Sequence, residues 1–141
     1  MKEIIVDTDI LSYYLFKNYP TLSKKFGDYI DKVGYINIAR PTVFEIESGL
    51  RAKNAFSQLK KFEKFLDKQR VVELTQRSAH LSAKMYASLR KKGLHSGVND
   101  LYIAGIALEN DLIICTNNEK DYKNIAEIEI INWLEQRLED T

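Results

Sequence analysis

The strongest constraint on the fold is the alternation of short apolar runs with longer amphipathic stretches along the whole chain. The apolar runs lack polar alternation and occupy residues 4–6, 71–74, 112–115 and 128–131, with a weaker run at 35–39. Runs of this kind predict strands buried on both faces, as in a parallel sheet. Helical spacing is found between them, at 9–16, 20–33, 41 to beyond 49, 55–69, 77–92, 99–110 and 132–139. The alternation predicts a three-layer α/β/α fold around a mostly parallel sheet of about five strands.

The length and composition favour one domain over residues 1–141. The 141 residues include only two prolines and six glycines, and we find no internal repeat or low-complexity segment. No apolar stretch approaches the roughly 18–20 residues that cross a bilayer, and the N-terminus lacks a signal-peptide pattern. The single cysteine, Cys115, cannot form an internal disulfide. We therefore expect a cytoplasmic protein without a membrane partner.

Charge is distributed unevenly although the net charge is only +1. Residues 51–95 hold twelve Lys/Arg and three Asp/Glu, whereas residues 96–141 hold three Lys/Arg and ten Asp/Glu. A nuclease needs a basic surface beside an acidic site, because its substrate is a polyanion. On charge alone, however, two solvated helical faces of opposite sign are the simpler explanation.

Polar residues follow two of the predicted strands, at the sheet edge where α/β proteins form their sites. Asp7 follows the first run, and Thr116 and Asn118 follow the run at 112–115, with Asp121 shortly after. Such an Asp often only caps the next helix, so Asp7 alone is a weak indication. We interpret Asp9 as a surface or first-turn helix residue.

Two further acids lie in predicted helices. Asp100 opens a helix whose small apolar residues share its face, which favours a side chain on the sheet side; a first-turn helix-dipole carboxylate explains it equally well. Glu45 is followed at i+4 by Gly49, which leaves the space over that face open. An interior helix glycine costs about 1 kcal/mol relative to alanine, so Gly49 needs an explanation.

Convergence of Asp7, Glu45, Asp100 and Asp121 at one sheet edge would create strong mutual repulsion unless a divalent cation were bound. Oxygen donors suit Mg²⁺ or Mn²⁺, and no Cys/His spacing indicates zinc. Such a site suits phosphodiester hydrolysis.

Four segments together resemble the PIN-domain nucleases, and in particular the VapC-type toxins. They are "IIVDTDILSYYL", "PTVFEIESGL", "NDLYIAGIALEND" and "LIICTNNEKDY", in the family's order and spacing. The resemblance implies catalytic acids at Asp7, Glu45, Asp100 and Asp121, with metal held by Asp7, Asp100 and Asp121. Many members carry an acid where this chain has Asn118. Thr116 and Asn118 are then supporting residues that hold metal-bound water or orient a carboxylate.

The resemblance also implies partners and a substrate. It implies an endoribonuclease that cuts structured RNA such as tRNA or rRNA and leaves a 5′-phosphate and a 3′-hydroxyl. A homodimer and inhibition by a small DNA-binding antitoxin are further implications. Within the basic stretch, the candidates for contact with the RNA backbone are Lys60, Lys61, Lys64, Arg90, Lys91 and Lys92.

Two alternatives remain at this point. A PIN-like scaffold could bind RNA or a partner protein without cutting, and Asn118 in place of an acid keeps this alternative open. A haloacid-dehalogenase-type phosphatase would use Asp7 as nucleophile and Asp9 as general acid. That chemistry also needs a later pair of acids after a strand, and only 25 residues follow Thr116.

Overall fold

The computed structural model describes residues 2–134 of the chain. Within them, five strands form one sheet in the order β3–β2–β1–β4–β5, and every pairing is parallel. The strands are β1 Ile4–Val6, β2 Asn37–Ala39, β3 Arg70–Val72, β4 Ile113–Cys115 and β5 Ile130–Ile131. The helices are α1 Thr8–Phe16, α2 Pro20–Val33, α3 Arg40–Ala52, α4 Phe56–Leu66, α5 Gln76–Lys91 and α6 Val98–Asn110, with a 3₁₀ helix, η1, at Glu119–Asp121.

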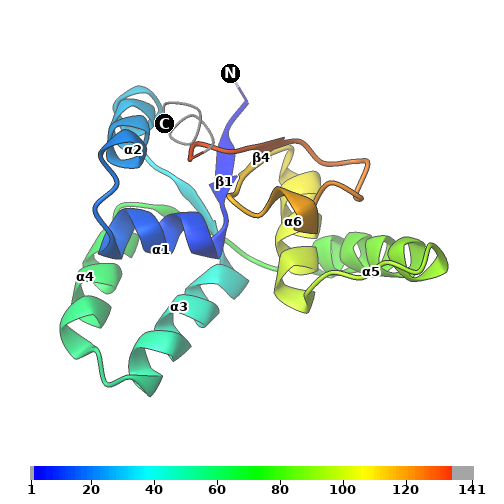
Figure 1. Cartoon of the computed structure of the whole chain (residues 1–141), viewed down its shortest axis with the longest axis horizontal. Coiled ribbons are helices and arrows are strands. Elements are labelled where there is room, and N and C mark those ends of the chain that lie inside the picture. Colours follow the sequence, from blue (N-terminus) through cyan, green and yellow to red (C-terminus); the bar gives the residue numbers. More distant parts are fainter. Residues whose placement is uncertain (1, 135–141) are drawn as a thin grey trace.

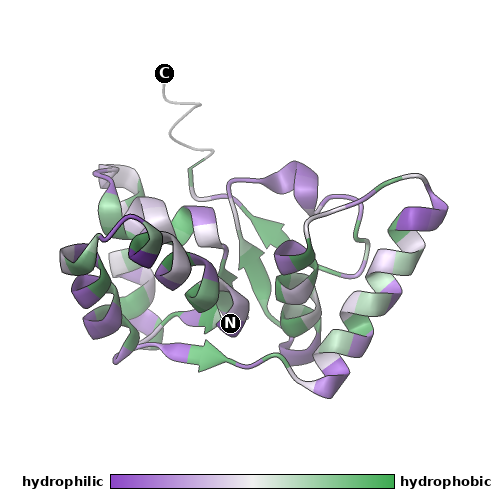
Figure 2. Cartoon of the chain, turned by 90° about the horizontal axis from the view of Figure 1, so that it is seen from below, coloured by the Kyte–Doolittle hydropathy of each residue, from purple (hydrophilic) through white to green (hydrophobic). Residues whose placement is uncertain are grey.

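Helices cover both faces of the sheet, as the uninterrupted apolar runs predict. Figure 1 shows α1 to α4 on one side of the strands and α5 and α6 on the other. Successive strand residues point to opposite faces: Val6 packs into the cluster under α1 to α4, and Ile5 into the cluster under α5 and α6. Both are fully buried, and Figure 2 shows the hydrophobic strands between helices with polar outer faces. The predicted three-layer architecture is therefore confirmed.

Several predicted boundaries differ from the observed ones. The weakest candidate strand, at 35–39, forms β2, which pairs with both β1 and β3. The strand predicted at 71–74 covers Arg70–Val72, and Glu73, beyond its end, pairs with Arg40 at 2.7 Å on the surface. The run at 128–131 is a strand only over Ile130–Ile131. The helix predicted at 132–139 falls mostly outside the described residues, and 133–134 form a turn.

The strand order reverses beside β1, and this reversal positions the site. The chain passes from β1 to β2 on one side and later returns to β4 on the other side of β1. Val6 lies opposite Cys115, and the backbone N–H of Asp7 donates to the Cys115 carbonyl at 2.9 Å. The residues that follow β1 and β4 therefore meet at the carboxyl edge, where open α/β sheets place their ligands.

Within residues 2–134, no helix is both long enough and apolar enough to span a bilayer.

Candidate active site

Asp7 lies at the carboxyl end of β1 and is the N-cap of α1. Its Oδ1 accepts a hydrogen bond from the backbone N–H of Asp9 at 3.0 Å, which satisfies one of the unpaired donors of the helix end. Its Oδ2 accepts from the Thr116 hydroxyl, after β4, at 2.7 Å. The Asp7 side chain is buried, with only 4% exposed. One oxygen of this carboxylate therefore caps the helix, and the other lies at the end of the sheet.

Asp100, in the first turn of α6, meets Asp7 at a shared hydroxyl group. The Tyr122 hydroxyl lies 3.2 Å from Asp100 Oδ1 and 3.3 Å from Asp7 Oδ2. Tyr122 is 1% exposed. Because a phenol carries one hydrogen, it donates to only one of the two carboxylates at a time. The two acids are therefore held within reach of one group, although 92 residues separate them in the sequence.

Burial and mutual repulsion disfavour the charged forms of both acids. Burial raises the pKa of Asp7, and the hydrogen bond from Thr116 partly offsets this shift. Burial, followed by the charge of Asp7, raises the pKa of Asp100 to about 7. Burial also raises the pKa of Tyr122, which keeps its proton. Among residues 2–134, no ion pair involves Asp7 or Asp100. The site therefore concentrates negative charge that the described chain does not neutralise.

Asp121 joins this group from η1. Its Oδ2 accepts from the side-chain amide of Asn118, and its backbone carbonyl accepts from the Ser96 hydroxyl at 2.8 Å. Its carboxylate is close enough to contribute to the raised pKa of Asp100. The backbone N–H of Asn118 also donates to Thr116 Oγ1 at 2.9 Å. Thr116 thus contacts Asp7, and Asn118 contacts Asp121 and Thr116.

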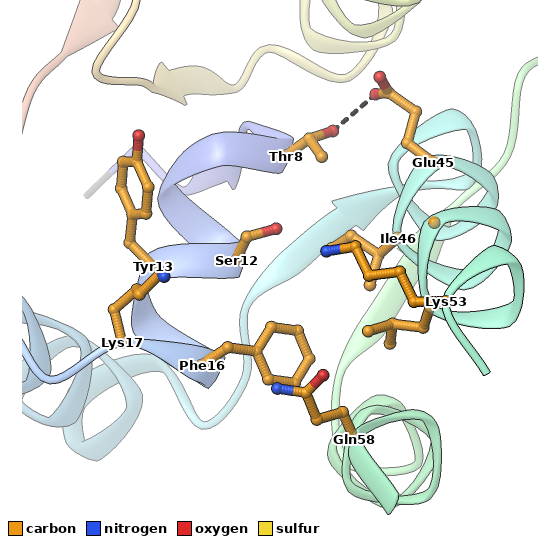
Figure 3. A pocket seen from close by; sticks show the side chains of 11 residues that line it. Thr8, Ser12, Tyr13, Phe16, Lys17, Glu45, Ile46, Lys53 and Gln58 are labelled. Carbon is orange, nitrogen blue, oxygen red and sulfur yellow. Dashed lines mark hydrogen bonds between the residues drawn. The ribbon is translucent and has the colours of Figure 1, made fainter. Parts of the chain in front are cut away.

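Glu45 approaches the same edge from α3. Its Oε1 accepts from the Thr8 hydroxyl at 2.7 Å, as Figure 3 shows, and Thr42 Oγ1 lies 3.3 Å from that hydroxyl. Partial desolvation of its carboxyl group, and then the charges of Glu45 and Asp121, raise the pKa of Asp9. Asp9 therefore lies close enough to Glu45 and Asp121 for their charges to act on its carboxyl group.

The structure groups Asp7, Asp100 and Asp121, and it places Glu45 beside Thr8 at the same edge of the sheet. It also adds residues that sequence reasoning missed. Asp9 is an exposed first-turn residue, as expected, but it belongs to the acidic group. Tyr122, Thr8 and Ser96 were not predicted to contribute. Only Tyr122 had a sequence signal, because it directly follows Asp121 in the last motif.

The predicted RNA contacts divide between two distant helices. Those at 60, 61 and 64 lie on α4, and those at 90–92 lie at the end of α5; Figure 1 shows these helices on opposite sides of α1 and α3. The Lys61 ammonium donates to the Leu15 carbonyl at 2.6 Å and lies 5.9 Å from the Phe16 ring centroid. The basic stretch at 51–95 therefore does not form one continuous surface.

The donors at this edge are carboxylate, hydroxyl and amide oxygens, which suit a hard divalent cation. The Tyr122 hydroxyl has one hydrogen for Asp7 and Asp100, and the only other hydroxyl at these two oxygens among the described residues is that of Thr116, on Asp7, so a cation would reduce the repulsion between the two acids. Within residues 2–134, no three Asp, Glu, His or Cys side chains lie close enough to form a complete metal site in this arrangement. The chemistry of the donors therefore fits a metal ion, although the described side chains do not form a complete site.

Comparisons with known proteins show both sequence and structural similarity over most of the chain. The chain is 26% identical over 130 residues to the ribonuclease VapC2 of Rickettsia felis, covering 92% of this chain and 96% of the relative. It is 23% identical to the ribonuclease VapC2 of Haemophilus influenzae, covering 95% of this chain and 100% of the relative.

The solved structures show the same fold. The structure of VapBC2 from Rickettsia felis, bound to a DNA fragment from its promoter, matches with a TM-score of 0.84 and 24% identity, covering 92% of this chain and 98% of that one. DNA-bound VapBC from Salmonella typhimurium matches with a TM-score of 0.84 and 23% identity, covering 94% and 99%. The family model for the PIN domain matches residues 4–128, so the chain belongs to the PIN domain family.

Proposed function

We propose that this chain is a Mg²⁺- or Mn²⁺-dependent endoribonuclease and the toxin of a VapBC-type toxin–antitoxin pair. Relatives named as VapC ribonucleases align over more than nine tenths of the chain. The observation that carries the proposal is the contact of Asp7 and Asp100 with one buried hydroxyl at the carboxyl edge of the sheet. No lysine or arginine among the described residues forms an ion pair with Asp7 or Asp100, so these acids are suited to binding a metal ion from solution.

In this proposal, Asp7, Asp100 and Asp121 hold the metal ion, which supplies positive charge to polarise a phosphodiester and activate water. Thr116 holds Asp7 through its hydroxyl, and Asn118 holds Asp121 through its amide. Glu45 has one oxygen on Thr8 and a second, Oε2, with no partner among the described residues. Oε2 of Glu45 can therefore accept the proton that the attacking water loses.

The hydrolysis we propose breaks the bond between phosphorus and the 3′ oxygen. The water oxygen forms a new bond to phosphorus, and the departing 3′ oxygen takes a proton, which leaves a 5′-phosphate and a 3′-hydroxyl. Structured RNA of the tRNA or rRNA class is the proposed substrate. A homodimer in the cytoplasm, inhibited by a small DNA-binding antitoxin, is the proposed biological form; the structures named for VapBC support the antitoxin partner.

The test is RNA cleavage by the purified wild-type chain with Mn²⁺, with Mg²⁺ and with EDTA. We expect cleavage only with metal, and a loss of about 100-fold or more in Asp7→Asn and Asp100→Asn. Asp31→Asn, on the exposed surface of α2, serves as the matched control and should cleave like wild type. Metal-independent cleavage, or cleavage that survives both site substitutions, would contradict the proposal.

A second candidate is an RNA- or protein-binding scaffold that does not cut, and one observation favours it. Asn118 stands where the resemblance implies an acid in many members, and its amide donates to Asp121 Oδ2 instead of supplying a further carboxylate. A wild-type chain that binds RNA but cleaves none of a varied set in Mn²⁺ would establish the scaffold. The phosphatase alternative has no support, because the matched family is the PIN domain.

A further inference from the structure

A groove extends away from Glu45, between α1 and α3 and toward α4 (Figure 3). Its volume is about 290 Å³. Each of the two helices contributes a row of residues spaced by four, a spacing that places side chains on one face. The rows are Thr8, Ser12 and Phe16 on α1, and Glu45, Gly49 and Lys53 at the end of α3. One end of the groove is therefore continuous with the acidic site.

Gly49 keeps the middle of this groove open, and the chain has no internal need for it. A Cβ atom built at Gly49 would meet nothing within 4 Å, and its φ is not positive. Neither packing nor backbone conformation therefore requires glycine, although glycine destabilises a helix interior relative to alanine. Gly49 therefore leaves open space against α3 in the middle of the groove.

The groove is basic at the end away from Glu45. Figure 3 shows the Lys53 ammonium extending across the groove toward Ser12 on α1. Lys17 lines the same groove, and neither lysine has an ion pair or side-chain hydrogen bond within residues 2–134. The aromatic rings of Tyr13 and Phe16 also line it. Unpaired ammonium groups beside aromatic rings are the features that bind the phosphates and bases of a single strand.

We propose that this groove is the subsite for the RNA strand next to the scissile phosphate; the inference rests on the proposed ribonuclease function. Lys53 and Lys17 contact backbone phosphates, the aromatic rings lie beside bases, and Gly49 leaves room for the strand. The α3 row from Glu45 to Lys53 rises about 12 Å along the helix, enough for a few nucleotides. We assign RNA as the occupant because the groove combines lysines that have no ion pair in the described chain with aromatic rings, and it joins the acidic site at Glu45.

The first test compares two helix glycines. Gly27, in α2, also has open space around its Cβ position and lies outside the groove, so Gly27→Gln is a matched control for Gly49→Gln. Both variants should melt about 2–5 °C higher than wild type, because glutamine is the better helix former. In EDTA, Gly49→Gln should bind a short fluorescein-labelled single-stranded RNA about tenfold more weakly by anisotropy, and Gly27→Gln should bind like wild type.

The second test compares two exposed lysines. Lys53→Gln should weaken binding of the same RNA about three- to tenfold and reduce the dependence of log affinity on log salt by about 0.7. Lys68 is exposed and precedes the amino end of β3, so it lies at the edge of the sheet opposite the acids. Lys68→Gln is therefore the matched control and should change neither the affinity nor its salt dependence. Under cleavage conditions, the groove variants should raise KM more than they lower kcat.

The outcomes separate this inference from the proposed function. If wild type cleaves RNA and both groove variants bind RNA as tightly as wild type does, the subsite is wrong and the nuclease stands. If these variants instead lose only their binding to the protein encoded beside this chain's gene, the groove belongs to a protein segment, which also overturns the inference. A wild-type chain that neither binds nor cleaves RNA overturns both proposals.

Discussion

The single hydroxyl hydrogen of buried Tyr122 lies between the carboxylates of Asp7 and Asp100 at the end of β1. Tyr122 donates to Asp7 or to Asp100 but not to both at once, and its raised pKa keeps it a donor at all working pH values. The hydroxyl therefore positions the two acids relative to each other. A phenylalanine would fill the same space without this hydrogen.

Substitution Tyr122→Phe tests the positioning role. We expect the free energy of unfolding of the metal-free protein to fall by about 1–3 kcal/mol, because a buried hydrogen bond to a carboxylate is lost. We also expect weaker Mn²⁺ binding by calorimetry. Tyr35→Phe, which removes a hydroxyl that lies 3.1 Å from Glu3, is the matched control and should leave Mn²⁺ affinity unchanged. Equal effects of both substitutions on Mn²⁺ affinity would refute the positioning role.

The pKa of Asp100 predicts how stability depends on pH. The folded state raises this pKa from 3.8 to about 7, so between these values the folded protein keeps a proton that the unfolded chain has released. Stability without metal should therefore decrease as pH rises from about 4 to about 7. Asp100→Asn should remove this decrease. At pH 8 its free energy of unfolding should exceed that of wild type by about 1–2 kcal/mol, a figure that allows for solvent screening of a partly buried group, and its melting temperature should be correspondingly higher.

Thermal unfolding in EDTA across this pH range measures the effect. At pH 4 the two proteins should melt at similar temperatures, because the wild-type carboxyl is then neutral. A wild-type protein whose midpoint stays constant relative to Asp100→Asn over the whole range would show that the Asp100 carboxylate is not destabilised by its surroundings.

Among the elements, the packing of α6 on α5 fixes where Asp100 lies. Gly105 of α6 faces α5, and an added Cβ would overlap Ser82 Oγ and the Ser78 carbonyl. The Ser82 hydroxyl also donates to the Leu101 carbonyl at 2.7 Å, one residue beyond Asp100. The two helices therefore approach at their backbones, and this approach sets the position of the first turn of α6.

Substitution Gly105→Ala should separate α5 and α6 and lower the free energy of unfolding by about 1–3 kcal/mol, because the added methyl group has no space. Denaturant unfolding measures this loss. Gly27→Ala is the matched control, since its Cβ would meet nothing, and should instead increase stability by up to about 1 kcal/mol. A neutral or stabilising Gly105→Ala would show that α5 and α6 can move apart freely.

For the molecule as a whole, the proposed metal site would couple metal binding to folding, because its acids come from distant parts of the sequence. The unfolded chain does not hold Asp7 and Asp100 together, so a cation held by both acids would bind the folded state in preference to the unfolded one. At about 100 times the dissociation constant, such a ligand stabilises the fold by about 2.7 kcal/mol.

We therefore expect Mn²⁺ to raise the melting temperature of the wild-type protein by several degrees and to raise that of Asp7→Asn far less. Differential scanning fluorimetry at constant ionic strength measures both values, with K⁺ salts as the control for ionic strength. An equal rise in wild type and in Asp7→Asn would place the stabilising cation elsewhere on the protein.

The sequence predicted the layers and the sheet because buried parallel strands and amphipathic helices leave local patterns. The run at 4–6 and the stretch at 20–33 became β1 and α2 within their expected limits. The prediction of strand ends was less successful: β3 ends at Val72, and Glu73 beyond it pairs with Arg40, 33 residues away in the sequence. The resemblance to the PIN-domain nucleases also indicated Asp7, Glu45, Asp100 and Asp121, and the structure places them at one edge of the sheet.

What local pattern could not decide was how these groups meet. The strand order that places β4 beside β1 brings Thr116 and Tyr122 onto Asp7, and no sequence interval encodes that contact. The same tertiary arrangement divides the basic stretch at 51–95 between α4 and α5, and gives the groove a lysine, Lys53, that the charge count did not single out. Hydrophobic periodicity is a local property of the chain, whereas the contacts of a site depend on how separate elements pack.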